Sequence, residues 1–480
     1  MTGLSHVSGA SGLASGAKHA SAASVPLAEL RAWAALAIGS LATAGIFAVL
    51  LAVSRIPGIE VIAFWPLDFF AKGLVIHVVF SLVVWFLTVF ALLASLAAAK
   101  IAGSGLRFAG LGGIGAVAVA VSYPLLFLTA FDPASEPSLN NYIPVIQHPA
   151  YYAGLAVLAF GIFMPVLRLL LNIPSRLKEL PPLAFAMSAA SVIYVVALVC
   201  FACATYLSWG TSPSKGLNEV LFWGGGHMLQ FLFCTLMLTG WFLLSRSSLG
   251  DQVIEPDVFR VAVLMLVAFT LPGPFLFRFF DMSSVNFREA FSKLQFVMAL
   301  PTLMVGVALL FGVARAKKSA PLPWRDPAFL AFFLSMAVFA AGGLMGNLIS
   351  GSDTRTPAHY HGVIAGVNLA AMGLVLTLCL PALQRPPRNS RLLRVQLWLF
   401  GAGQLVACIG LFWAGGYGAP RKTPTSVGSL VDGAVMGMYL NGIGALFAVA
   451  GGVMFVVTVI GALSTRANAE IASDNFAKSS

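Results

Sequence analysis

The sequence predicts an all-α fold, a polytopic membrane bundle of about twelve transmembrane helices. Hydrophobic residues make up 59% of the 480 residues, charged residues make up 9%, and the mean hydropathy is +0.91. Soluble domains contain far fewer apolar and far more charged residues. Apolar runs long enough to cross a bilayer core of about 30 Å also recur along the chain. In order, they lie at 33–54, 73–99, 108–131, 150–171, 182–207, 220–244, 258–277, 294–314, 328–350, 358–382, 395–416 and 433–463.

The spans leave a short tail at each end of one membrane domain. The first 25 residues are rich in Ala, Ser and Gly and lack the continuous apolar core of a signal peptide. We therefore expect a disordered cytoplasmic tail at 1–30, a membrane domain at 31–465 and a cytoplasmic C-terminal tail at 466–480.

The basic residues predict the orientation of the bundle. The net charge is +11, but the 28 basic residues are divided unequally between the two sides of the predicted spans. Nineteen fall on the side of both termini, which the positive-inside rule makes cytoplasmic. The other nine fall outside: Arg55, Lys72, Lys215, Arg278, Arg288, Lys293, Arg355, Arg421 and Lys422. This distribution indicates a lipid bilayer, and no nucleic acid, as the partner of the charged residues.

Four of the seven histidines fall within spans and at one depth. His77, His227, His359 and His361 all lie in the predicted outer leaflet. A single intramembrane histidine can simply hydrogen-bond a carbonyl and fix helix packing. Because ionisable residues in a membrane usually mark a site, and imidazole binds haem iron and copper, the shared depth of four favours a cofactor site.

Two of these histidines, His359 and His361, are separated by one residue. Positions two apart on an α-helix point about 200° away from each other. The two imidazoles would therefore address different partners, so one helix could ligate two cofactors.

The string Thr-Pro-Ala-His-Tyr-His-Gly at 356–362 resembles the tenth helix of subunit I of the haem-copper oxidase superfamily, nearest to its B-type, C-type and nitric oxide reductase branches. The resemblance covers roughly 30–465. It implies two haems, expected to be b-type. His359 would ligate a high-spin haem where gas is reduced, and His77 with His361 would ligate a low-spin haem.

A second similarity lies between the last two spans, where Gly-Ala-Pro-Arg-Lys at 418–422 is similar to the family's Gly-x-Pro-Arg-Arg loop. The resemblance implies that Arg421 and Lys422 bind haem propionates, because paired cations on the outer side would neutralise two carboxylates. An ordinary solvated loop is the alternative.

The sixth span carries Trp-Gly-Gly-Gly-His at 223–227, similar to the family's Trp-x-x-Gly-His, whose histidine ligates copper. His227 takes that place. Family members supply two further, adjacent histidines about fifty residues later, but this chain has Leu-Pro-Gly-Pro-Phe-Leu-Phe-Arg there. Arg278 in that stretch could pair with Asp281 or occupy the copper position. One imidazole does not hold copper firmly, so the sequence leaves a copper site in doubt.

The resemblance implies a respiratory oxidoreductase of a bacterial inner membrane that passes electrons from a cytochrome c or quinol donor through the low-spin haem to dioxygen. A small cupredoxin-like or c-type cytochrome subunit is the expected accessory partner. One alternative is a copper-less homologue acting in electron transfer, nitric oxide reduction or gas sensing. Another is a haem-free transporter, against which the histidine pattern and the lack of matching broken helices argue.

Overall fold

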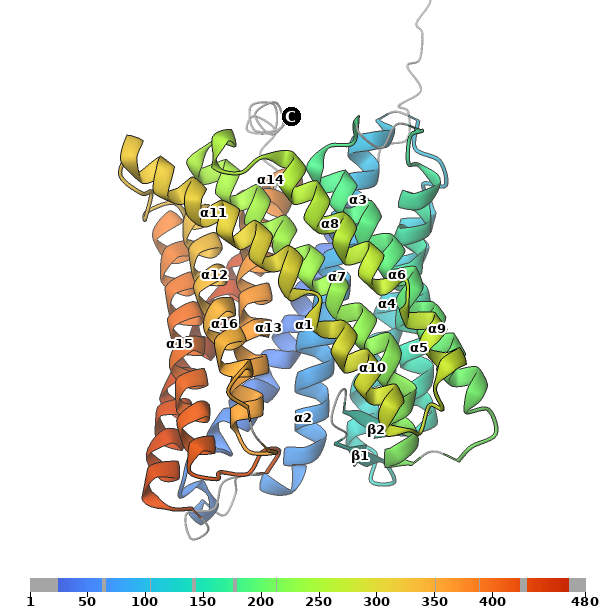
Figure 1. Cartoon of the computed structure of the whole chain (residues 1–480), viewed down its shortest axis with the longest axis vertical. Coiled ribbons are helices and arrows are strands. Elements are labelled where there is room, and N and C mark those ends of the chain that lie inside the picture. Colours follow the sequence, from blue (N-terminus) through green and yellow to red (C-terminus); the bar gives the residue numbers. More distant parts are fainter. Residues whose placement is uncertain are drawn as a thin grey trace, which may run out of the picture.

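Twelve helical segments long and apolar enough to cross a membrane run through the part of the chain that the structure describes, as the sequence predicts (Figure 1). The structure is a computed structural model and describes residues 25–465, apart from 63–65, 104, 140–143, 176–178, 213, 350, 388 and 424–429. A bilayer imposes this architecture, because a helix satisfies its own backbone hydrogen bonds where no water can. An even number of crossings returns the chain to the side on which α1 begins.

The helices have the following bounds. They are α1 (Leu27–Val53), α2 (Phe70–Val78), α3 (Trp85–Ala102), α4 (Leu111–Phe127), α5 (Pro149–Leu171), α6 (Pro182–Leu207), α7 (Lys215–Leu249), α8 (Pro256–Thr270), α9 (Gly273–Phe279), α10 (Val285–Phe296), α11 (Ala299–Ser319), α12 (Pro327–Gly346), α13 (Arg355–Leu374), α14 (Leu380–Ala382), α15 (Ser390–Gly416) and α16 (Asp432–Ser464). Two π-helical turns, η3 (Val79–Val84) and η7 (Val375–Cys379), join α2 to α3 and α13 to α14 within single spans.

Short elements occupy the connections. Among the described residues, the 3₁₀ turns are η1 (Ile59–Val61), η2 (Leu67–Phe69), η4 (Leu128–Phe131) and η6 (Asp251–Val253). The strands β1 (Glu136–Ser138) and β2 (Val145–Gln147) pair antiparallel, with Pro137 opposite Ile146. His148 follows β2 and accepts a hydrogen bond from the Ala150 N–H as the N-cap of α5.

The spans that carry the four histidines are the innermost ones. Within the most apolar window of each span, 89% of the residues are buried in Lys215–Leu249, and 72% in both Phe70–Ala102 and Arg355–Ala382. The corresponding share is 28% in Val285–Ser319 and in Asp432–Ser464, which therefore face the lipid. The histidines thus sit where a membrane bundle places its functional groups.

A buried ion pair closes the bundle at the end where α1 begins. The Arg168 guanidinium donates to both carboxylate oxygens of Glu29, at 2.8 and 2.6 Å, and also to the Ser95 hydroxyl. Both charged side chains are almost fully buried. The tail expected at 1–30 is therefore too long by a few residues, because Leu27–Leu30 already belong to α1 and Glu29 holds it to α5. Residues 1–24 and the tail expected at 466–480 lie outside the described residues.

Glycines bring α15 and α16 into the most extensive helix contact of the bundle. A Cβ atom on Gly444 would overlap the backbone of Ala407, and one on Gly403 would overlap the backbone of Ala448. Because lipid gives no hydrophobic drive between helices, such close backbone packing is what holds them together.

Replacing Gly444 with Ala should lower the thermal unfolding temperature in mild detergent, because the added methyl group meets backbone and overpacking costs about 1–3 kcal/mol. Gly461→Ala on the same helix is the matched control, since nothing lies within 4 Å of its added methyl. Equal unfolding temperatures for the two variants would contradict close packing at Gly444.

Candidate haem-binding site

The two histidines of α13 face opposite partners, as their spacing predicts. The His359 Nδ1–H donates to the Gly342 carbonyl on α12 at 2.8 Å. His361 instead interacts electrostatically with His77 and with Arg55, which come from the spans of α2 and α1. One helix therefore presents two imidazoles to two separate environments.

Glycines on α12 and α13 let the two helices approach closely enough for the His359 hydrogen bond to form. A Cβ on Gly342 would lie 2.5 Å from the Val363 nitrogen, and a Cβ on Gly362 would lie 2.6 Å from the Gly342 Cα. A Cβ on Gly346 would lie 2.5 Å from the His359 Nδ1. The imidazole thus occupies space that only glycine leaves open.

His77 lies near the end of α2, just before the π-helical turn η3. Its Nδ1–H donates to the Ala44 carbonyl of α1 at 3.1 Å. Eight residues further on, the buried Trp85 indole N–H donates to the Asn368 side chain of α13 at 2.7 Å. This bond connects the spans of His77 and His361 about two turns below the histidines, because a turn takes 3.6 residues.

His227 is buried within α7 and lined by aromatic rings. Its Nδ1–H donates to the Trp223 carbonyl at 2.6 Å. The ring centroid lies 4.8 Å from that of Trp223 and 6.0 Å from that of Phe291. Only 2% of the residue is exposed, so the side chain belongs to the bundle interior.

Three histidines thus share one hydrogen-bonding arrangement. A backbone carbonyl can only accept, so the Nδ1 atoms of His77, His227 and His359 must carry the proton in these contacts. In a neutral ring the Nε2 atom then keeps its lone pair and can bind a metal. Such a hydrogen bond to a carbonyl fixes the tautomer and orientation of metal-ligating histidines. His361 packs beside Tyr360, with ring centroids 5.1 Å apart.

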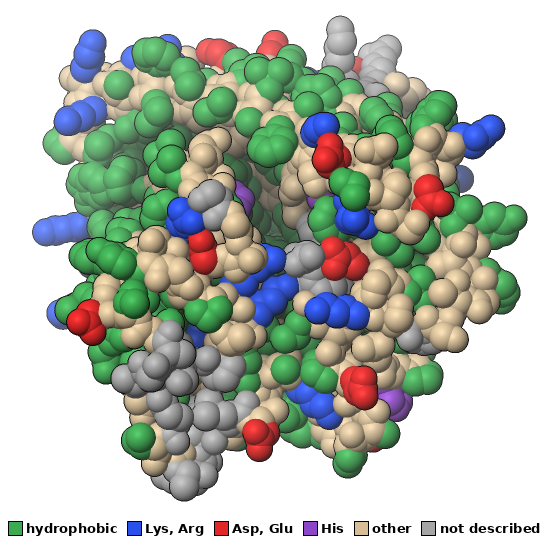
Figure 2. Space-filling model, turned by 60° about the horizontal axis from the view of Figure 1, so that its bottom comes forward, with side chains coloured by type: hydrophobic (Ala, Val, Ile, Leu, Met, Phe, Trp, Pro, Cys, Tyr) green, Lys and Arg blue, Asp and Glu red, His purple; other side chains and the backbone are tan. Residues whose placement is uncertain are grey.

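The end of the bundle that carries β1 and β2 is hollowed between the helices. Figure 2 shows this end with a deep recess, Lys and Arg side chains at its opening and His side chains in its walls. His77, His359 and His361 are partly buried in the structure.

The loop carrying Arg421 is fixed to the start of α13. Asp353 forms a backbone bridge with Pro420, and the Thr354 N–H donates to the Ala419 carbonyl at 3.0 Å. Arg421 acts electrostatically on Asp353 and on Tyr360. The structure therefore places this cation on the same side of the bundle as His361.

Lys422 lies near Arg421, and also near α7 and the residue after β1. Its backbone is left-handed, with φ 61°, and its ammonium donates to the Leu139 carbonyl at 3.4 Å. Burial, together with the nearby Arg421 and Lys215, lowers the pKa of Lys422 to about 8, against the opposing effect of Glu219. The two cations therefore lie close enough to interact, and Lys422 also contacts the chain after β1.

Arg55 is the site residue that the sequence reasoning missed. It acts electrostatically on both Tyr360 and His361, although it follows α1 and is distant from them in the chain. The sequence signal for Arg55 was its position as a cation at the outer end of the first span, which contributed to the predicted orientation but not to the predicted site.

The residues around His227 do not fit a copper ion. Among the described residues, no group of three or more His, Cys, Asp and Glu side chains is arranged to hold a metal. Phe277, about fifty residues after His227, packs its ring 5.8 Å from that of Phe291, the neighbour of His227. The Arg278 side chain is exposed, so it does not supply a charge at the copper position, and no ion pair joins it to Asp281 among the described residues.

Comparisons with known proteins converge on one family. The family described as "Cytochrome C and Quinol oxidase polypeptide I" matches residues 30–449. "Uncharacterized protein RP382" of Rickettsia prowazekii is 24% identical over 490 residues, with 88% of this chain and 94% of that protein covered. A "Cytochrome c oxidase subunit 1" of Thermus thermophilus is 26% identical over 327 residues, with 58% of this chain and 56% of that protein covered.

The fold is also that of a solved structure. A chain from a cryo-EM structure of a heme-copper terminal oxidase dimer superposes with a TM-score of 0.74 at 17% identity. The match covers 92% of this chain and 85% of the other. At this identity the similarity concerns the fold.

Proposed function

Because this chain belongs to the cytochrome c and quinol oxidase polypeptide I family, an oxidoreductase family of the membrane, we propose that it passes electrons through a low-spin haem to a high-spin haem that reduces dioxygen. The observation that carries the proposal is the histidine set of three inner spans, in which His359 and His361 face opposite sides of α13. Family membership gives no support to a haem-free transporter.

The residues fit two haems. His77 and His361 lie on facing spans and would together hold one haem, while His359 on the other side of α13 would hold a second. Haem supplies one-electron chemistry and, where one axial position is open, a place for a gas to bind. Because α13 holds His359 and His361 two residues apart, the helix fixes the separation of the two groups.

The chain's own side chains define the chemistry at each position. Nδ1–H bonds to helix carbonyls hold His77 and His359 in the tautomer that leaves Nε2 free. Arg55 provides positive charge near His361 and Arg421 near the adjacent Tyr360, which suits carboxylate groups at that end of the bundle. Lys422 provides charge on the side of α7.

A copper-less homologue acting in electron transfer, nitric oxide reduction or gas sensing is the second candidate. The surroundings of His227 favour it, because phenylalanine rings stand where a copper site needs nitrogen or sulfur donors. In that case no copper would lie beside the high-spin haem, and the buried His227 would face the bound gas directly.

We further propose a cytochrome c or quinol donor, a small cupredoxin-like or c-type cytochrome accessory subunit, and a bacterial inner membrane with both termini cytoplasmic. The family's description names both donors, and the similar proteins from Rickettsia and Thermus are bacterial. The excess of basic residues on the side of the termini supports the orientation.

Metal analysis of the chain purified in mild detergent tests this proposal. We expect two irons per chain and haem spectra of one low-spin and one high-spin group. His361→Ala should halve the haem content by removing the low-spin signal, because its axial ligand is lost. His148→Ala, which changes a helix cap instead, is the control. A wild-type haem spectrum from His361→Ala would refute the assignment.

The same preparation separates the two candidate functions. Rapid dioxygen consumption from a reduced donor, with two haems bound per chain, would support the oxidase. Two irons without copper and slow dioxygen consumption would support the copper-less candidate.

Replacing Gly346 with Ala should weaken the high-spin haem signal and leave the low-spin signal in place. The added methyl would lie 2.5 Å from the His359 Nδ1 and displace the ring from the Gly342 carbonyl. The matched control is Gly343→Ala on the same helix, where nothing lies within 4 Å of the methyl. Absorption spectra of the reduced proteins report the result, and equal high-spin signals in both variants would contradict the role of Gly346.

Haem retention should fall as the pH rises above about 8. In the folded chain without haem, the pKa of Lys422 is lowered to about 8, so its ammonium is charged below that pH and neutral above it. A bound haem carboxylate would raise this pKa, so haem binding favours the charged form and weakens as the pH rises above about 8. Loss of the charge should weaken haem binding roughly tenfold, since hydrogen bonds to charged groups contribute about 1.5–3 kcal/mol. Haem transfer to apomyoglobin between pH 7 and 10 measures this. Lys422→Arg should remove the dependence, and an unchanged dependence would exclude Lys422 as its origin.

A further inference from the structure

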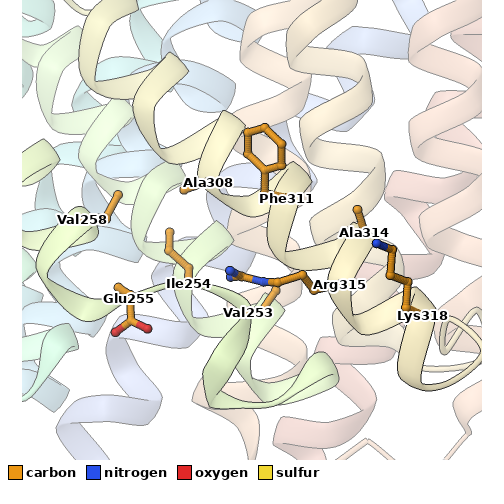
Figure 3. A pocket seen from close by; sticks show the side chains of 9 residues that line it. All are labelled: Val253, Ile254, Glu255, Val258, Ala308, Phe311, Ala314, Arg315 and Lys318. Carbon is orange, nitrogen blue, oxygen red and sulfur yellow. The ribbon is translucent and has the colours of Figure 1, made fainter.

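A groove opens between α8 and α11 at the end of the bundle opposite the histidines (Figure 3). Its volume is about 430 Å³. The groove lies beside a close contact in which Gly312 of α11 meets the Val253 carbonyl, where no Cβ could fit. Its lining consists of Val253, Ile254, Glu255, Val258, Ala308, Phe311, Ala314, Arg315 and Lys318.

Charged groups of both signs border the groove. Arg315 and Lys318 are three residues apart on α11 and so lie on one helix face. Glu255, just before α8, lies across from them, and in Figure 3 the Arg315 guanidinium points into the space between the two helices. Arg315 has a long contact of 3.4 Å with the Gln252 carbonyl, and within the described residues neither Glu255 nor Lys318 forms an ion pair. The groove therefore offers two cations and one carboxylate to a ligand.

The other part of the groove is apolar and open to the bilayer. Val258 and Ala308 line it, and Phe311 is 68% exposed. Leu264 and Leu310, on the outward faces of α8 and α11, are also more than half exposed. These helices belong to the least buried spans. Its occupant must therefore combine an apolar chain with a headgroup that carries both charges.

We propose that this groove binds a glycerophospholipid with a primary-ammonium headgroup, phosphatidylethanolamine. Arg315 and Lys318 bind the phosphate, Glu255 binds the ammonium, and an acyl chain lies along Val258, Ala308 and Phe311. The charges decide the headgroup, because a lipid with a phosphate but no ammonium would place its negative charge near Glu255 without compensation. Cationic side chains at the cytoplasmic surface attract phospholipid headgroups in general, but the carboxylate opposite them adds selectivity.

Native mass spectrometry of the full chain with synthetic phosphatidylethanolamine, phosphatidylglycerol or phosphatidylcholine tests the proposal. Wild-type protein should retain one phosphatidylethanolamine under conditions that remove the other two lipids. The double variant Arg315→Gln, Lys318→Gln should reduce the retained fraction about tenfold, since both phosphate contacts are lost. Equal retention by the double variant, or stronger retention of phosphatidylglycerol by wild type, would overturn the assignment.

Two further variants make the test specific, and a third is the control. The control is Lys317→Gln. Lys317 is a cation on the same helix turn but does not line the groove, so this variant should retain the lipid as the wild type does. Glu255→Gln should abolish the preference for phosphatidylethanolamine over phosphatidylglycerol, and a preserved preference would exclude Glu255 as the ammonium ligand. Ala308→Trp fills the apolar part of the groove without changing charge. It should also release the lipid, and full retention would show that the groove is not the binding site.

Discussion

The contact of α12 with α13 at Gly342 and Gly362 is the constraint on which the proposed haem site depends. Two helix backbones approach closely there because neither carries a side chain at the crossing. The approach brings the Gly342 carbonyl within 2.8 Å of the His359 Nδ1, so one residue both permits the crossing and orients the imidazole. Backbone contact of this kind is strong in a bilayer, where dispersion forces and hydrogen bonds replace the hydrophobic effect between helices. The far side of α13 is then left free to present His361 to the span of His77.

A second hydrogen bond extends this arrangement across the bundle. The Trp85 indole and the Asn368 side chain are buried and bonded at 2.7 Å, and an unpaired polar group at that depth would cost several kcal/mol. Their pairing therefore aligns the spans of His77 and His361 and helps to hold the two imidazoles at one level. The π-helical turn that begins two residues after His77 changes the direction of the following side chains, as such turns often do near functional sites.

The two ends of the bundle differ in the chemistry they offer. At the recessed end, Arg55, Arg421 and Lys422 concentrate positive charge near the histidines, and the lowered pKa of Lys422 reflects its partial burial first and the neighbouring cations second. At the other end, Glu29 and Arg168 pair with each other in the interior, whereas Arg315, Lys318 and Glu255 line a groove at the surface. Around His227 the described neighbours are the aromatic rings of Trp223 and Phe291, and no group of three possible metal ligands surrounds it among the described residues.

The sequence by itself determined the all-α membrane bundle, the twelve spans and the opposite facing of His359 and His361, because hydropathy and helical periodicity act along the chain. It also showed that the adjacent histidines expected about fifty residues after His227 are missing, because the residue types at those positions are read directly from the sequence. The tertiary structure decided which groups meet. Arg55 interacts electrostatically with His361, Lys422 donates to the Leu139 carbonyl, and Glu29 joins the first helix to Arg168, all through interactions between residues remote in sequence. The groove of Arg315 and Glu255 arises in the same way, because it exists only where α11 crosses the chain before α8, and no local pattern encodes that crossing.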